Sequence, residues 1–263
     1  MKFGKLTNPM KDILDEIRTT HDLGFDYIEI GIEGPAGTPE IILKKKKQIL
    51  ILLKKYKMFA LGHTSWWADL GSQYEPVRIG WLEEGRKAIR LCNELGIKLL
   101  NFHSHSIGTY IKDETGRKII LNNFVRSLKE LVKYGKKYNV EIMLENAAEK
   151  GEIKDFKHFK YIIDKVPGLK VHLDVGHAFI DDDMKGVEKY VRTFKSKIVH
   201  VHMHDNHGKS DEHLPLGAGL IDYKKVIKLL KKIRYNRTIT FEVFSKDLDL
   251  LESSMKKVKK LCN

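Results

Sequence analysis

Several features that would indicate a secreted or membrane-bound protein are missing from the sequence. Its 263 residues include only two cysteines, Cys92 inside an expected helix and Cys262 next to the last residue, so we expect no disulfide framework. There is no run of about 18 apolar residues that could form a transmembrane helix, and the first residues lack the apolar core of a signal peptide. We therefore expect a cytoplasmic protein without a membrane partner.

Glycine-rich phosphate-binding motifs are absent as well. Neither G-x-G-x-x-G nor G-x-x-x-x-G-K occurs in the chain, which disfavours an open nucleotide-binding sheet. No glycine- or proline-rich linker and no low-complexity segment interrupts the sequence. We therefore expect one domain that covers residues 1–263.

The chain is strongly basic, with a formal net charge of +13. A basic surface attracts phosphate, so nucleic acid is one candidate partner. Much of the excess, however, lies in lysine clusters on expected helices, at residues 44–47, 54–55, 136–137, 231–232 and 256–260. A solvated outer ring of helices explains this distribution without nucleic acid, and we favour that interpretation.

Apolar runs rich in β-branched residues alternate with helical patterns eight times along the chain. The expected strands cover residues 2–6, 27–30, 58–62, 98–102, 141–144, 169–174, 198–201 and 238–243. The expected helices cover residues 9–23, 39–56, 76–95, 121–138, 155–165, 184–195, 223–233 and 247–261, the first of them with Asn8 as N-cap and Pro9 at its first position. Such alternation predicts a parallel sheet. The expected fold class is α/β, a single (β/α)₈ TIM barrel.

A histidine or a carboxylate stands at the end of nearly every expected strand. The six residues are His63, His103, Glu145, Asp174, His202 and Glu242. In a (β/α)₈ barrel the active site is built at the C-terminal ends of the strands. Because these six side chains are of metal-ligand type, the pattern predicts one metal site that gathers the strand ends.

Three short motifs add to this pattern. Asp174-Val-Gly-His177 places a carboxylate and an imidazole where strand six is expected to give way to a loop, and Asp211-Glu-His213 lies in a later loop. In HVHMHDN, residues 200–206, alternate histidines share one face of an extended strand. With these motifs the candidate ligands number nine: His63, His103, Glu145, Asp174, His177, His202, Asp211, His213 and Glu242.

Each of these residue types also has an ordinary structural explanation. An isolated histidine such as His21, His158 or His172 is expected to be a satisfied or surface residue, and Asp174 and Asp211 could cap helices. The joint pattern is what favours a metal site. Nitrogen and oxygen ligands together suit Zn²⁺ or Mn²⁺, whereas an all-oxygen set would indicate Mg²⁺ or Ca²⁺.

Six segments of the chain resemble the xylose-isomerase-like TIM-barrel superfamily, which includes endonuclease IV and the sugar epimerases related to D-tagatose 3-epimerase. The segments are LGIKLLNFHSHS, MLENAAEKG, LDVGHAF, HMHDN, DEHLPLGAG and FEVF. Together they are specific, although each alone would be weak. The resemblance covers nearly the whole chain and is strongest over residues 61–242.

The resemblance to endonuclease IV implies up to three metal ions. The implied ligand groups are His63, His103 and Glu145; Glu145, Asp174, His202 and Glu242; and His177, Asp211 and His213. The epimerase branch would retain only the second ion, and there Glu145 and Glu242 would also be the acid–base pair. The expected cofactor is therefore one to three divalent ions, Zn²⁺ or Mn²⁺.

Departures from both branches leave two functions open. Against endonuclease IV, residues 103–106 read His-Ser-His-Ser instead of His-Pro-Gly-Ser, and the second βα loop lacks the arginine that wedges into DNA. Against the epimerases, Gly208 and Gly151 stand where that branch has a substrate-binding arginine and glutamate. Trp66 and Trp67 could wedge into DNA, stack on a sugar or simply pack, and packing is the simplest reading.

We expect a metal-dependent isomerase or epimerase that moves a proton next to the carbonyl of a sugar or sugar phosphate. Its catalytic residues would be Glu145 and Glu242, and Trp66 and His105 would contact the substrate. The alternative is an endonuclease IV-like phosphodiester hydrolase that cleaves DNA at abasic sites, with DNA as partner. The oligomeric state stays open, and a homodimer is one option.

Overall fold

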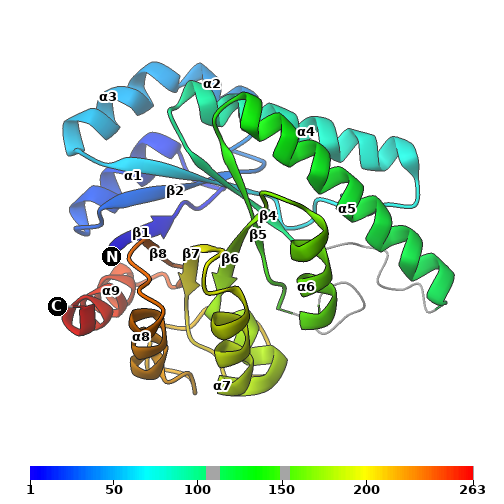
Figure 1. Cartoon of the computed structure of the whole chain (residues 1–263). Coiled ribbons are helices and arrows are strands. Elements are labelled where there is room, and N and C mark those ends of the chain that lie inside the picture. The colour runs from blue at the N-terminus through cyan, green and yellow to red at the C-terminus, as the bar shows by residue number, and fades with distance from the viewer. Residues whose placement is uncertain (105–112, 149–154, 263) are drawn as a thin grey trace.

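The chain forms a closed barrel of eight parallel strands (Figure 1). The computed structural model describes residues 1–104, 113–148 and 155–262. The strands are β1 Lys2–Leu6, β2 Tyr27–Ile32, β3 Phe59–Thr64, β4 Leu99–His103, β5 Glu141–Glu145, β6 Lys170–Asp174, β7 Ile198–Met203 and β8 Thr238–Phe241. Each strand pairs with its neighbour in sequence, and β8 pairs with β1. The expected (β/α)₈ TIM barrel is confirmed.

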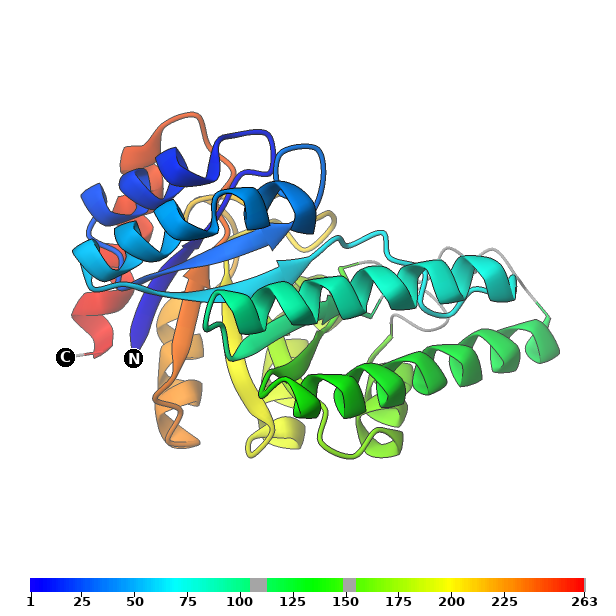
Figure 2. The same cartoon turned by 90° about the horizontal axis from the view of Figure 1, so that it is seen from above.

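Helices lie outside the strands, as the view from above also shows (Figure 2). They are α1 Ile13–Asp22, α2 Pro39–Lys44, α3 Lys46–Tyr56, α4 Glu75–Glu94, α5 Glu114–Lys137, α6 Phe156–Lys165, α7 Val175–Phe194, α8 Tyr223–Lys232 and α9 Leu248–Cys262. The two ends of the chain lie side by side, with Cys262 Sγ 3.6 Å from Met1 Sδ. Within the described ranges, no helix combines the length and the apolar character needed to span a bilayer.

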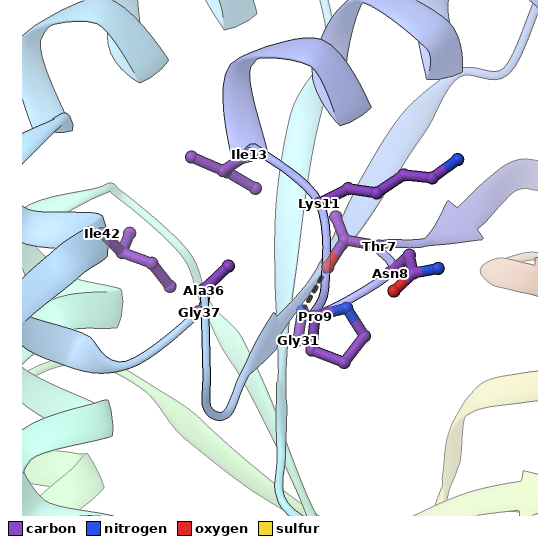
Figure 3. Close-up of a pocket in the computed structure, with 9 residues that line it drawn as sticks. All are labelled: Thr7, Asn8, Pro9, Lys11, Ile13, Gly31, Ala36, Gly37 and Ile42. Carbon is purple, nitrogen blue, oxygen red and sulfur yellow. Dashed lines mark hydrogen bonds between the residues drawn. The ribbon is translucent and has the colours of Figure 1, made fainter.

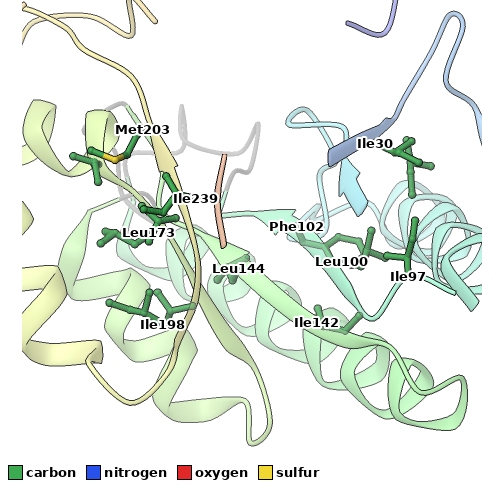
Figure 4. Packing of buried hydrophobic residues seen from close by; sticks show 14 of the residues in the cluster. Ile30, Ile97, Leu100, Phe102, Ile142, Leu144, Leu173, Ile198, Met203 and Ile239 are labelled. Carbon is green, nitrogen blue, oxygen red and sulfur yellow. The ribbon is translucent and has the colours of Figure 1, made fainter. Parts of the chain in front are cut away.

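The pleat of the strands divides their side chains between two environments. Residues such as Leu100 and Phe102 of β4, or Ile142 and Leu144 of β5, belong to the apolar core between strands and helices (Figure 4). The residues between them point the other way, because successive side chains of a strand face opposite sides. The barrel interior therefore receives the histidines and carboxylates, while the stability of the fold rests mainly on the outer core.

The first helix begins later than the sequence pattern predicts. Asn8 does not cap it; its carbonyl accepts from Lys11 N and its side chain from Met10 N, which makes a turn. The N-cap is Asp12, whose side chain accepts from Leu14 N at 2.8 Å. The prediction that Asn8 caps this helix and that Pro9 is its first residue was wrong, because both residue types are as favourable in a turn as at a helix start.

Three other helices differ from their expected ranges. The helix expected at 39–56 is broken at Lys45 into α2 and α3. α5 begins seven residues before the expected position, at Glu114 in place of 121. α7 begins directly after β6 and is kinked at Asp182 and Asp183, so that the helix expected at 184–195 is only its second part.

Gly4 offers a test of how tightly the barrel interior is packed. A Cβ atom at Gly4 would lie 2.2 Å from Cε2 of Tyr27, and this buried ring is held in place by a 2.8 Å hydrogen bond between its hydroxyl and Thr240 Oγ1. We expect Gly4→Ala to lower the free energy of unfolding by about 1–3 kcal/mol, as overpacked cores do.

Gly80 is the matched control, because it is exposed in α4 and a Cβ there would meet nothing within 4 Å. Gly80→Ala should raise the free energy of unfolding by about 0.5–1 kcal/mol through helix propensity. Urea denaturation of both variants measures the two changes. Equal stability of Gly4→Ala and wild type would show that the ring of Tyr27 can move away.

Candidate metal centre

Strand register brings the expected ligands together at one end of the barrel. β4 and β5 pair His103 with Glu145, and β6 and β7 pair Asp174 with His202. His63 is the fifth residue of β3, and Glu242 follows the last residue of β8. Because all eight strands are parallel, these positions meet at the C-terminal rim.

The first group consists of His63, His103 and Glu145. Nε2 of His63 and Nε2 of His103 lie 3.4 Å and 3.2 Å from the same oxygen, Glu145 Oε2. The two imidazoles contact each other edge to face, with ring centroids 4.6 Å apart. One ligand-type atom of each residue lies within 4.8 Å of the others, a spacing that one metal ion could bridge.

The second group consists of Glu145, Asp174, His202 and Glu242, all of them buried. Nδ1 of His202 lies 2.9 Å from Glu242 Oε2, 3.8 Å from Asp174 Oδ2 and 4.0 Å from Glu145 Oε1. Glu145 thus presents one oxygen to each of the first two groups. The carboxylates of Glu145 and Glu242 face the same small space.

The third group contains His177, Asp211 and His213. Asp211 Oδ2 lies 3.1 Å from Nε2 of His177 and 2.8 Å from Nε2 of His213. The other ring nitrogens face carbonyl oxygens, His177 Nδ1 that of Asn146 at 2.7 Å and His213 Nδ1 that of Glu242 at 3.0 Å. A carbonyl can only accept, so Nδ1 carries the hydrogen in both rings and Nε2 is directed at the site.

Asp174 is both a helix cap and a member of the second group. It precedes α7 and its Oδ1 accepts from His177 N at 2.7 Å. The prediction of a loop between Asp174 and His177 is therefore wrong. The two residues belong to the start of a helix, which fixes their relative position. The side chain of Asn146, at the end of the neighbouring strand, fixes the backbone of Asp174 through two hydrogen bonds of 2.9 Å. Its Nδ2 donates to Asp174 O, and its Oδ1 accepts from Asp174 N. Asp211, in contrast, caps no helix and lies in the loop after β7.

The lack of hydrogen bonds at several buried polar atoms of these residues also fits a metal site. Among the described residues, most of the buried side-chain atoms without a hydrogen bond lie here: both ring nitrogens of His63, His172 and His204, Nδ1 of His103 and Oδ2 of Asp174. Buried polar groups are normally paired, because an unpaired one costs about 1–3 kcal/mol. Mixed imidazole and carboxylate donors are the set that Zn²⁺ or Mn²⁺ takes.

Sequence reasoning missed Glu29 of β2. Its Oε2 lies 2.9 Å from Nε2 of His200 and 2.9 Å from Nε2 of His202, and it accepts from Thr240 Oγ1 at 2.6 Å. Because the flanking histidines outweigh the effect of burial, the pKa of Glu29 lies well below its usual range. The ionised carboxylate holds the hydrogen on Nε2 of His202 and leaves Nδ1 for the second group. A single acid within the apolar run YIEIGI was the available signal.

His172 and His204 were missed as well. His172 was expected to be a satisfied or surface residue, but it is fully buried inside the barrel, and its Nδ1 lies 3.3 Å from Glu145 Oε2. His204, also fully buried, lies beside Asp174 and Asp211. The alternation of the HVHMHDN motif placed His204 on the same face as His202, but His204 was not included among the candidate ligands.

Opposed charges set the protonation of the metal-free centre. Burial raises the pKa of Glu145, yet the surrounding histidines lower it well below its usual range. Burial lowers the pKa of His202, but Glu29 and Glu242 raise it well above its usual value. For His213 burial is likewise outweighed, by Glu242 and Asp211, which together raise its pKa to about 9. Imidazolium groups thus balance the buried carboxylates when no ion is bound.

Of the two expected substrate contacts, Trp66 lies among the described residues. Trp66 lies just beyond β3, is 57% exposed and touches Trp67 edge to face, with ring centroids 5.6 Å apart. It is therefore not a core residue. His105 lies outside the described residues.

A small hollow near the rim is separate from the centre (Figure 3). It is lined by the loops after β1 and β2, including Thr7, Pro9 and Ala36. Thr7 Oγ1 accepts from Gly31 N at 2.9 Å across it. None of the candidate ligands lines this hollow.

Sequence comparison places the chain near both expected branches. The family model described as xylose isomerase-like TIM barrel matches residues 17–261. An uncharacterized protein of Methanocaldococcus jannaschii is 30% identical over 192 residues, which cover 72% of this chain and 73% of that protein. A probable endonuclease 4 of Aquifex aeolicus is 28% identical over 248 residues, which cover 87% of this chain and 86% of that protein.

Solved structures share the fold. A D-tagatose 3-epimerase-like protein superposes with a TM-score of 0.87 and 27% identity, covering 100% of this chain and 97% of the other. The IolI protein, solved with a bound zinc atom, has a TM-score of 0.79 and 20% identity, covering 100% and 96%. The second likeness concerns the fold alone.

We expect metal binding to release protons. His202 and His213 are protonated near neutral pH because their pKa values are raised, and imidazole binds a metal only through a deprotonated nitrogen. The apparent affinity for Zn²⁺ should therefore rise with pH from neutrality to about pH 9, the range over which His213 loses its proton. Calorimetry in buffers of different ionisation enthalpy counts the protons released. A pH-independent affinity between pH 7 and about 9 would contradict this prediction.

Proposed function

Because the chain belongs to the family of xylose isomerase-like TIM barrels, we propose that it is a metal-dependent isomerase or epimerase of a sugar or sugar phosphate. The observation that supports this function most directly is the second group. It presents three carboxylates and one imidazole within 4.8 Å of one another in a buried setting. A bound Zn²⁺ or Mn²⁺ would polarise the substrate carbonyl and so acidify the hydrogen on the neighbouring carbon.

Glu145 and Glu242 are the proposed acid–base pair. Both carboxylates are buried, and the pKa of each lies below its usual range despite burial, because histidines surround them. They are therefore ionised and able to accept a proton near neutral pH. One carboxylate removes the proton next to the carbonyl, and the other takes up a proton from solvent and delivers it to the product. The structure supports this pairing by placing their oxygens within 4.8 Å.

Substrate binding is proposed for the aromatic side of the rim. The exposed indole of Trp66 offers an apolar face against which the C–H face of a sugar ring can stack. His105 is retained as a second proposed contact from the sequence pattern alone. The solved epimerase-like neighbour supports a sugar as the substrate class.

Phosphodiester hydrolysis at abasic DNA sites is the second candidate. Two observations favour it: all nine expected ligands gather in three groups, and the relative from Aquifex aeolicus is a probable endonuclease 4. Bound ions would activate water and neutralise charge that develops at phosphorus. The net charge of +13 suits a DNA partner. Proton transfer on a sugar requires only the second group, so the complete set by itself does not decide between the candidates.

Solvent exchange tests the proposed chemistry. Proton transfer next to a carbonyl labels that carbon with deuterium when the enzyme, its metal and a ketose or ketose phosphate are incubated in D₂O. We expect Glu145→Gln and Glu242→Gln each to reduce labelling by about 10²–10⁴-fold, because an amide cannot act as a base. Part of the metal affinity should remain, since the amide oxygen can still ligate. Labelling is followed by NMR and metal content by elemental analysis.

Glu212→Gln is the control for these variants. Glu212 lies in the same rim region, but its carboxylate binds the exposed His207 and is not part of the three groups. It should keep wild-type labelling. Incision of abasic duplex DNA without exchange in any sugar tested would replace the isomerase proposal with the endonuclease, and DNA affinity should then fall steeply with salt.

A further inference from the structure

We propose that His204 is a metal ligand and that it closes the third group into a four-residue zinc site. The site would consist of His177, His204, Asp211 and His213. This inference rests on the proposed metal centre but not on the sugar chemistry. It assigns the third group a structural role, distinct from proton transfer at the second group.

The first observation concerns the environment of the His204 side chain. It is fully buried, and neither ring nitrogen makes a hydrogen bond within the described part of the chain. Its Nε2 lies 3.2 Å from Asp174 Oδ1 and 3.5 Å from Asp211 Oδ1, so the ring is directed at the carboxylates of the rim. A buried imidazole without a hydrogen bond is destabilising, and a metal ion would supply the missing partner.

The second observation is the distance between ligand-type atoms. One atom each of His177, His204, Asp211 and His213 lies within 4.8 Å of the other three. The His204 ring is stacked on the His213 ring, with centroids 4.3 Å apart. His177 and His213 direct Nε2 toward Asp211, and His204 adds a third imidazole to a set that is otherwise incomplete for tetrahedral zinc.

The third observation explains why residue 176 is a glycine. A Cβ atom at this position would lie 2.0 Å from Cε1 and 2.4 Å from Nε2 of His204. Gly176 stands in the first turn of α7, where alanine would favour the helix by about 1 kcal/mol. The absence of a side chain is therefore accounted for by the imidazole, which occupies the space that a methyl group would need.

The chemistry of the four donors indicates the role of the site. Three imidazoles and one carboxylate fill the four positions of tetrahedral zinc and leave none for water or substrate, as in structural zinc sites. Asp211 and His213 belong to the loop after β7, whereas His177 belongs to α7. The ion would thus tie this loop to the barrel. It would also hold His213, whose φ of +50° is a strained backbone conformation for a non-glycine residue.

Metal analysis of a His204→Asn variant tests the inference. Wild-type protein should retain one zinc per chain after dialysis against a chelator that empties the second group, and His204→Asn should lose that ion. Cobalt in the wild-type site should show the intense visible bands of four-coordinate Co²⁺, and these should vanish in the variant. His207→Asn is the matched control, because His207 also follows β7 but is exposed and bound to Glu212. It should behave as wild type.

Gly176→Ala provides a second variant that keeps all four ligands. The added methyl group should displace the imidazole and weaken zinc binding by at least about 10–100-fold, as misplaced ligands do. In a His204→Ala background the same methyl group has room, so Gly176→Ala should no longer destabilise the metal-free protein. Thermal unfolding of the two single variants and the double variant measures this coupling.

The outcomes separate the inference from the proposed function. Retention of the zinc and of the cobalt spectrum in His204→Asn, or additive effects of Gly176→Ala and His204→Ala, would overturn the role of His204. Loss of the zinc in His204→Asn alongside a wild-type protein that exchanges no substrate proton would support the site and refute the isomerase. A wild-type protein that binds no metal would refute both.

Discussion

The carboxylate of Glu145 is the interaction on which the arrangement of the rim depends. It is 1% exposed, and nitrogens of four histidines, His63, His103, His172 and His177, lie 3.2–3.5 Å from its two oxygens. Asn101 also donates to it at 2.6 Å. A buried carboxylate without positive partners costs several kcal/mol. The histidines from β3, β4, β6 and α7 are therefore held around one charge. His63 and His177, whose pKa values are raised, supply positive charge that a metal ion would supply when it binds.

This polar interior is possible because the fold does not depend on it for its main core. The outward-facing residues of the strands pack against the helices in a continuous apolar layer. The inward-facing residues are then free to be histidine, carboxylate or threonine, as in β7 and β8, where His200 and His202 face Thr238 and Thr240. Removal of an interior ligand should therefore affect ion binding more than folding.

Shared carboxylates connect the three groups into one centre. Glu145 presents separate oxygens to the first and second groups, and Asp174 presents Oδ2 to His202 and Oδ1 to His204. The composition of the groups differs in a way that suits different roles. The second group is rich in carboxylates that can move protons, while the third, with His204, is rich in imidazoles that bind zinc firmly. Such a division is compatible with sugar chemistry at one ion and a structural role at another.

The sequence by itself determined the fold class and indicated nine candidate ligands, because alternation and the position of polar residues near strand ends are local properties of the chain. It misplaced the start of α1, where Asn8 and Asp12 could each have capped the helix, and it predicted a loop after Asp174 where α7 begins. Only the tertiary structure decided which side chains share a space. Register across the barrel brings Glu29 to His202, and the close approach of α7 to the end of β7 brings Gly176 to His204. Neither pair is close in sequence, so only the closure of the barrel could reveal them.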